Sequence, residues 1–308
     1  MPLSHYRIAA VHAHPDDESI WTGGLLAKLR RLGADVSVIT CTLGEHGEII
    51  GDTYQALGDH QLDQLGAFRV RELADALAVL GVNGPAHQPR LLGGLGAYHD
   101  SGMAGSATAE NTKALVNSGA AAVEELMGLL AAVRPHLVIS YDADGGYGHP
   151  DHIRAHELTV AATERLRAEC TAADEAGLYG TAWAVTDRQA LQAGLDAITE
   201  IPDGWRPTNT DEIACADAGA AGAVAVHLDA EDITAKREAM AAHATQVWIG
   251  DGRISDTNPE PAVGAVDGSG AAAGVWALSN LLCQPLLPVE HYVPGTVDRE
   301  RLSTLLGN

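Results

Sequence analysis

The sequence predicts an α/β protein with a Rossmann-like, mostly parallel sheet flanked by helices and a smaller C-terminal α+β cap. Apolar, β-branched runs alternate with stretches of helical periodicity along the first half of the chain, an order typical of parallel strands joined by right-handed crossovers. Polar clusters follow two of these runs, where open α/β sheets carry their chemistry. We expect a catalytic core over residues 1–170 and a cap over residues 171–308 that packs on the core and completes the substrate pocket, with a single domain as the alternative.

The first elements follow each other closely. Ile8–Val11 is a buried strand, and the helical pattern after it ends at Gly33, a residue type favoured just beyond a helix. Asp35–Cys41 is a β-branched run that fits a second strand. Gln61–Leu80 has apolar residues at helical spacing and ends at Gly81, which predicts the second helix.

The alternation continues to about residue 170. A short third strand is expected around Pro89–Leu92, followed by a glycine-rich loop over residues 93–105 that is mobile or functional. Ala120–Val133 reads as a helix, and His136–Tyr141 as the next strand. Another helix is expected to start near His152.

The composition is that of a globular chain: of its 308 residues, 46% are hydrophobic and 19% are charged. The formal net charge of −22 argues against a nucleic-acid partner or an anionic membrane surface and is compatible with a neutral sugar substrate. No apolar run is long enough to span a membrane. The cysteines are far apart, a spacing typical of reduced thiols in a cytoplasmic protein; they are Cys41, Cys170, Cys215 and Cys283. The sequence leaves open whether copies of the chain form a homo-oligomer.

Residues His14–Glu18 place an imidazole and three carboxylates directly after the first strand. Helix capping by Asp16 or Asp17 is the simple alternative, but it accounts for one acid and leaves His14 without a role. A divalent cation accounts for the set, because His14 and Asp17 supply nitrogen and oxygen ligands while Asp16 stays free for proton transfer. We therefore expect a metal site here.

A second polar cluster, residues 142–152, follows the strand at residues 136–141. If the two strands are neighbours at the switch point of the sheet, His152 comes within reach of His14 and Asp17. The result is a site of two histidines and one carboxylate. Zn²⁺ is the first expectation for its ion, and Fe²⁺ is the competitor.

A zincin-type metal site and a nucleotide-binding module are the two alternatives to this metal site. His152 and His156 stand four residues apart on the expected helix, as in zincins, but Glu157 follows the second histidine and misses the general-base position. His156 is therefore expected to lie beside the metal site without binding the ion. A nucleotide-binding module is disfavoured because Asp16 and Asp17 would repel a pyrophosphate at the first turn.

The motifs His14–Glu18 and Gly148–His152 together resemble those of the LmbE-like (PIG-L) zinc de-N-acetylase superfamily. Within it, the chain looks most like the branch that deacetylates GlcNAc-inositol glycosides in mycothiol biosynthesis. Other matching stretches are Cys41–Glu45, Asp100–Gly105 and Ala242–Gln246. Residues 170–220 and 249–273 match nothing in the family pattern, which leaves fine substrate choice open.

The resemblance implies a metal-dependent hydrolysis of an acetamide. One ion held by His14, Asp17 and His152 would acidify a water, and Asp16 would take the proton as general base. The attack would release acetate from the amino sugar.

The resemblance also implies the groups that assist this attack. His149, protonated and oriented by Asp151, would stabilise the oxyanion and protonate the leaving amine. Tyr147, flanked by Gly146 and Gly148, would swing in and donate a second hydrogen bond.

The resemblance implies that Arg69 and Asp100 hydrogen-bond sugar or inositol hydroxyls, with a surface charge or a turn former as the alternative for each. Glu48 is a further candidate contact, expected either at the pocket rim or on a solvated loop. His243 follows a helical stretch and is interpreted as a structural histidine outside the site. The sister branch, the mycothiol S-conjugate amidases, tends to carry a lysine shortly after the first motif. Residues 19–23 contain none, which favours the deacetylase.

Overall fold

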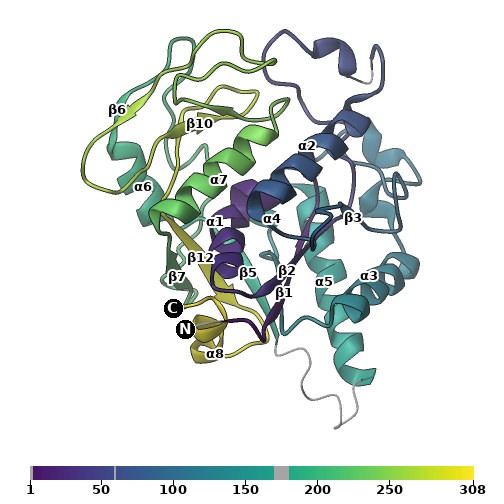
Figure 1. Ribbon diagram of the computed structural model, residues 1–308. Coiled ribbons are helices and arrows are strands. Elements are labelled where there is room, and N and C mark those ends of the chain that lie inside the picture. The colour runs from purple at the N-terminus through teal and green to yellow at the C-terminus, as the bar shows by residue number, and fades with distance from the viewer. Residues whose placement is uncertain (1–2, 59, 170–179) are drawn as a thin grey trace.

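The protein is built around one seven-stranded sheet, shown in Figure 1, a computed structural model that describes residues 3–58, 60–169 and 180–308. The strand order is β3-β2-β1-β4-β5-β12-β7. The strands span β1 Arg7–His12, β2 Asp35–Thr40, β3 Arg90–Leu91, β4 Leu137–Tyr141, β5 Gly180–Val185, β7 Val224–His227 and β12 Val289–Pro294.

Strand β1 lies at the switch point of this sheet. It pairs in parallel with β2 on one side and with β4 on the other, so that Ile8 lies opposite both Val36 and Leu137. The chain therefore leaves β1 and β4 toward the same edge of the sheet, where ligands bind in open α/β folds. The expected adjacency of these two strands is confirmed.

The sheet continues into the second half of the chain. Strand β5 is parallel to β4, whereas β12 is antiparallel to both β5 and β7. The core predicted for residues 1–170 thus shares its sheet with three later strands, and the division into two domains at this point remains a prediction.

Helices cover both faces of the sheet (Figure 1). One apolar cluster joins the sheet to α1, α2, α7 and α8, and the other joins it to α3 and α5. The helices span α1 Asp17–Arg31, α2 Leu65–Leu80, α3 Ala120–Val133, α4 Gly145–Gly148, α5 Pro150–Glu169, α6 Arg188–Asp196, α7 Ala230–Ala242 and α8 Arg299–Leu305. Single-turn 3₁₀ helices lie at Gln55–Leu57, Ala107–Glu110 and Leu115–Asn117.

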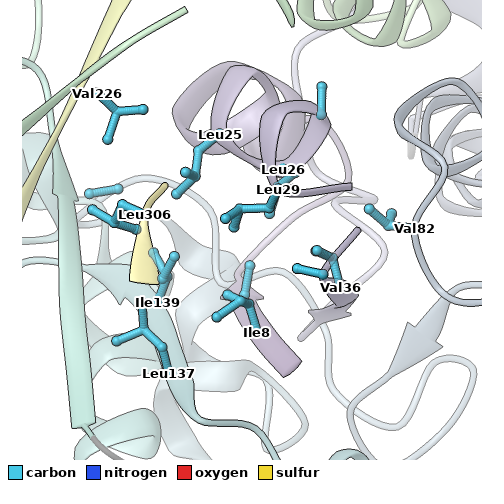
Figure 2. Packing of buried hydrophobic residues seen from close by; sticks show 14 of the residues in the cluster. Ile8, Leu25, Leu26, Leu29, Val36, Val82, Leu137, Ile139, Val226 and Leu306 are labelled. Carbon is cyan, nitrogen blue, oxygen red and sulfur yellow. The ribbon is translucent and has the colours of Figure 1, made fainter. Parts of the chain in front are cut away.

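Successive strand residues alternate between these two clusters. Ile8 belongs to the cluster under α1, and its neighbour Ala9 belongs to the cluster under α3 and α5. Figure 2 shows Leu25, Leu26 and Leu29 of α1 packed over Ile8. A strand buried on both faces explains why the first strand reads as an unbroken apolar run.

Most expected elements are found at their expected places. The helix predicted at Ala120–Val133 has those bounds, and Gly33 and Gly81 have φ of 92° and 70° just beyond their helices. The helix predicted to begin at Gln61 starts instead at Leu65. The amides of residues 61–64 donate back to carbonyls of residues 56–58 and so complete a turn after the 3₁₀ helix.

The cap region adds two small sheets beside the main one. One has the order β11-β10-β8, with β11 Gln284–Pro285, β10 Val275–Ala277 and β8 Trp248–Ile249. The other pairs β6 Ile198–Glu200 with β9 Ala265–Val266. Within the described ranges, no helix has both the length and the apolar content that crossing a bilayer requires. Free thiols are found at Cys41, Cys215 and Cys283, and Cys170 lies outside the described residues.

Candidate metal-dependent active site

The connection between β1 and α1 carries the first polar cluster. Asp16 lies at the N-cap position with φ of 112°, a conformation that is costly for a non-glycine residue and is typical of functional sites. Its side chain makes no capping hydrogen bond. Asp17 Oδ2 accepts the backbone N–H of His14 at 2.9 Å. Capping by Asp16 therefore does not explain this cluster.

The three expected metal ligands converge. His14 Nδ1 lies 3.4 Å from Asp17 Oδ2, and His152 Nε2 lies 3.4 Å from Asp17 Oδ1. One ligand atom from each residue falls within 4.8 Å of the others, and all three side chains are buried. Two imidazoles and one carboxylate are a ligand set that suits a zinc or iron(II) ion.

In each imidazole, the nitrogen that is not near Asp17 faces an acceptor, as in metal-binding histidines. His14 Nε2 lies 3.2 Å from Asp151 Oδ2, and His152 Nδ1 lies 3.1 Å from the Gly145 carbonyl. A carboxylate or carbonyl behind a metal-binding imidazole fixes its tautomer and leaves the other nitrogen for the ion. The residues present therefore fit a divalent metal. His156 belongs to neither candidate ligand group, and its Nδ1 faces the Tyr141 carbonyl at 2.9 Å.

Asp100, a predicted sugar contact, lies directly beside this cluster. Its Oδ1 lies 3.7 Å from His14 Nε2, and Asp100, His14 and His149 form a second group of converging ligand atoms. Burial alone would lower the pKa of His14, but Asp100 and Asp151 outweigh it and raise that pKa well above the usual value. Such a field of buried carboxylates favours a cation.

Asp16 and Arg69 form a buried pair beside the metal ligands. Arg69 Nη2 lies 3.1 Å from Asp16 Oδ2, and the same guanidinium donates to the carbonyls of Pro15 and Gly44. Burial raises the pKa of Asp16 to about 6, and Arg69 opposes this rise. Arg69, a predicted substrate contact, lines the cavity of this site. It is only 3% exposed, and its guanidinium holds the Asp16 loop.

In the structure, His149 is paired with the backbone N–H of Asp151 and not with its carboxylate. Nδ1 of His149 accepts the backbone N–H of Asp151 at 3.1 Å, whereas Asp151 Oδ2 accepts the Ser101 amide at 2.8 Å and faces His14. Asp151 lies in the first turn of α5, where its amide points back toward His149.

The surroundings of His149 disfavour the protonated ring that was expected. Burial, together with the nearby imidazoles of His14 and His152, lowers the pKa of His149 to about 3. This lowered pKa favours the neutral ring. Because Nδ1 accepts a hydrogen bond, the proton of the neutral ring lies on Nε2.

A family model described as PIG-L, GlcNAc-PI de-N-acetylase, matches residues 9–163. The chain belongs to the PIG-L family. The matched segment runs from β1 into α5 and so contains both polar clusters.

Relatives of this PIG-L protein extend over almost the whole chain. A protein of Corynebacterium efficiens is 50% identical over 293 residues, covering 95% of this chain and 89% of its own length. One of Rhodococcus opacus is 44% identical over 299 residues, covering 94% and 92%. Both are named 1D-myo-inositol 2-acetamido-2-deoxy-alpha-D-glucopyranoside deacetylase. A solved structure of the A40926 pseudoaglycone deacetylase Dbv21 is 24% identical, with a TM-score of 0.49 and coverage of 78% and 82%.

The PIG-L segment supplies only part of the cavity wall. A cavity of about 560 Å³ is lined by His14 and Asp17, two of the candidate metal ligands. Its remaining wall comes from the cap and β12, including Trp276, Leu286 and Val289. Glu48 lies on this wall, where its Oε2 accepts the Ser279 hydroxyl at 2.9 Å. The cap therefore takes part in enclosing any substrate.

Tyr147 lies at the cavity wall. Gly146 and Gly148 have φ of 76° and 78°, and Tyr147 is half-exposed. Its ring lies 5.1 Å from that of His152 and 5.8 Å from that of His149. The phenol is thus positioned beside the candidate metal ligand His152 and beside His149.

Proposed function

We propose that this PIG-L protein is a metal-dependent hydrolase that removes the N-acetyl group from a GlcNAc-inositol glycoside in mycothiol biosynthesis. The observation that carries the proposal is the convergence of His14, Asp17 and His152, next to a cavity that His14, Asp17 and the Asp16 carboxylate line. The relatives that align along almost the whole chain support the substrate class. Zn²⁺ is the proposed ion and Fe²⁺ the alternative.

When bound, a divalent ion supplies Lewis acidity to the acetamide carbonyl and lowers the pKa of a water. Asp16 is the general base that accepts the proton of the attacking water. Its pKa of about 6 suits this role near neutral pH, and the Arg69 guanidinium fixes its carboxylate. The protonated Asp16 then returns the proton to the leaving nitrogen, so that acetate and a free amine result.

His149 acts as a neutral hydrogen-bond donor. Its Nε2–H, set by the Asp151 amide, stabilises negative charge on the carbonyl oxygen during attack. Tyr147 donates a second hydrogen bond to the same oxygen. Neither group has to change its protonation state for this role.

The charge of the cavity supports a neutral glycoside. Carboxylates on its wall outnumber the cations Arg69 and Lys236, and they include Asp100, Asp187, Glu48, Glu212 and Glu290. An anionic substrate group would be repelled by this field, whereas sugar hydroxyls can donate to these carboxylates. Glu48 and Asp100 are the proposed contacts to sugar or inositol hydroxyls.

Acetate release from N-acetylglucosaminyl-inositol tests the proposal. The metal-loaded protein should release acetate, a chelator should abolish turnover, and Zn²⁺ or Fe²⁺ should restore it. Asp17→Asn should lose both metal and activity, whereas Asp75→Asn, at an exposed carboxylate of α2, should change neither. Turnover that survives complete metal removal would refute the mechanism. Faster cleavage of a mycothiol S-conjugate would reassign the chain to the amidase branch.

A further inference from the structure

Glu18 and His243 form a completely buried pair next to the proposed active site. His243 Nε2 lies 2.7 Å from Glu18 Oε1, and both side chains are 0% exposed. The two residues are 225 positions apart in the sequence. Neither lines the cavity, so neither can touch a substrate there.

The other oxygen of Glu18 holds the backbone of Asp16. The N–H of Asp16 donates to Glu18 Oε2 at 3.1 Å. Asp16 has φ of 112°, whereas the remaining positive-φ non-glycine residues in the described ranges lie between 49° and 59°. A conformation of this kind persists only where surrounding contacts hold it. One carboxylate thus connects His243 with the strained residue that carries the proposed base.

The turn that follows α7 also contacts α2, the helix whose Arg69 holds the Asp16 loop. The backbone amide and the hydroxyl of Thr245 donate to the Glu72 carboxylate at 2.8 and 2.7 Å. Glu72 lies one helical turn beyond Arg69 on α2, and Arg69 contacts both Pro15 and Asp16. Helix α7 packs against α1 and α2 (Figure 1), so this one turn supports both helices that fix the Asp16 loop.

Stability alone is a weak reason for such a pair. Burying two ionisable groups costs desolvation energy, and their mutual attraction often does no more than offset that cost. Replacing a buried ion pair by apolar residues of similar volume is often neutral or stabilising. An apolar residue at position 18 would, however, leave the Asp16 amide without its acceptor. The pair is therefore better explained by the backbone that it holds.

We propose that His243 is a positioning residue: through Glu18 it holds the backbone amide of Asp16 and so fixes where the Asp16 carboxylate lies relative to the metal ligands. This inference rests on the proposed function of Asp16 as general base. It places a residue of the C-terminal half, outside the segment matched by the family model, in control of the catalytic loop.

Two amide substitutions separate positioning from packing. Gln places its side-chain nitrogen about where Nε2 of His243 donates to Glu18, whereas Asn reaches only the position of Nδ1, which has no hydrogen-bond partner. His243→Gln therefore keeps the tether and His243→Asn breaks it, with similar polarity in both. His136→Gln is the control, because His136 is a buried histidine at the opposite end of the sheet, paired with the Arg7 amide.

Three measurements are made on each full-length, metal-loaded variant: kcat and KM separately, metal per chain, and hydrogen exchange of the Asp16 amide. His243→Asn should lower kcat about tenfold, equivalent to about 1.4 kcal/mol of barrier, with KM and metal content unchanged. Its Asp16 amide should exchange faster than in the wild type. His243→Gln should keep most of the turnover and the protection, and His136→Gln should match the wild type.

The inference is overturned if His243→Asn has the kcat and Asp16 exchange of the His136→Gln control. It is also overturned if the Gln and Asn variants lose turnover equally, since the loss then follows packing and not the tether. Should the Asn variant not fold, Glu18→Asp breaks the same bridge by shortening the carboxylate, and wild-type turnover and protection in that variant would contradict the inference. If even the wild type releases no acetate, the proposed function fails, whereas Asp16 exchange still reports on the tether.

Discussion

The backbone amide of Asp151 lies 3.1 Å from Nδ1 of His149 and fixes the tautomer of that ring. The carboxylate of the same residue faces His14 Nε2 at 3.2 Å instead. Asp151 therefore serves two histidines through two different groups. Its backbone serves the proposed oxyanion donor, and its side chain serves a proposed metal ligand.

Asp151→Asn should consequently weaken metal binding. The substitution removes the charge behind His14, and loss of such a partner typically lowers metal affinity about 10–100-fold. The tautomer of His149 should survive, because the backbone sets it. Competition with a chelator measures the affinity, with Asp75→Asn as the control. Unchanged metal affinity together with a shifted basic limb of the pH–rate profile would indicate that the Asp151 carboxylate acts on His149 instead.

His149→Gln should retain more activity than His149→Ala. If His149 donates a hydrogen bond as a neutral ring, an amide donor can replace it in part. Removing an oxyanion donor typically lowers kcat about 10²–10³-fold, and we expect Gln to recover about a tenth or more of the wild-type rate if only a donor is required. Steady-state kinetics on the acetylated glycoside measures both variants. Equal losses would indicate that His149 has to release a proton.

Asp16→Asn should separate the base from the metal ligands. We expect metal content to stay at the wild-type level, because Asp16 faces Arg69 and is not one of the converging ligands. Turnover should fall about 10²-fold or more, the usual scale for loss of a general base. Metal analysis and kcat on the same preparation provide the measurement. Loss of metal from this variant would make Asp16 a ligand.

Arg69→Gln should shift the acidic limb of the pH–rate profile to higher pH. Burial raises the pKa of Asp16 to about 6, and the Arg69 guanidinium holds it below the value that burial alone would give. Without the guanidinium this pKa rises further, so the base becomes deprotonated only at higher pH. Arg69→Lys keeps the charge and should leave the limb near its wild-type position. An unshifted limb in Arg69→Gln would assign the titration to another group.

The arrangement of the metal ligands could be predicted because it follows from the order of elements. Two strands that end in polar clusters, each followed by a helix, place His14 and His152 at one edge of a parallel sheet. The helix ends could be predicted where Gly33 and Gly81 adopt positive φ. These features depend on local sequence and on general topology rules.

The contacts of Asp151 and His243 could not be predicted in the same way. Spacing places Asp151 near both His149 and His14, but only the first turn of α5 decides which group faces which ring. His243 meets Glu18 because α7 packs on α1, and no local pattern records a partner 225 residues away. Likewise, nothing near β12 indicates that it inserts antiparallel between β5 and β7. Such contacts depend on tertiary packing.

A pair of glycine substitutions tests the packing of α1 against the cap side of the sheet. A Cβ at Gly24 would overlap Leu228 Cδ1 and come within 2.9 Å of Glu290 Oε1, the oxygen that accepts the Gly24 amide. Gly24→Ala should therefore lower the free energy of unfolding by about 1–3 kcal/mol, the usual cost of overpacking. Gly128 is exposed on α3 with open space around it, and Gly128→Ala should raise the same free energy by about 0.5–1 kcal/mol. Denaturant titration of both variants measures the difference. The two signs should be opposite although the substitution is identical, because only Gly24 lies against another chain segment; a stabilised Gly24→Ala variant would contradict the close packing of α1 on Leu228 and Glu290.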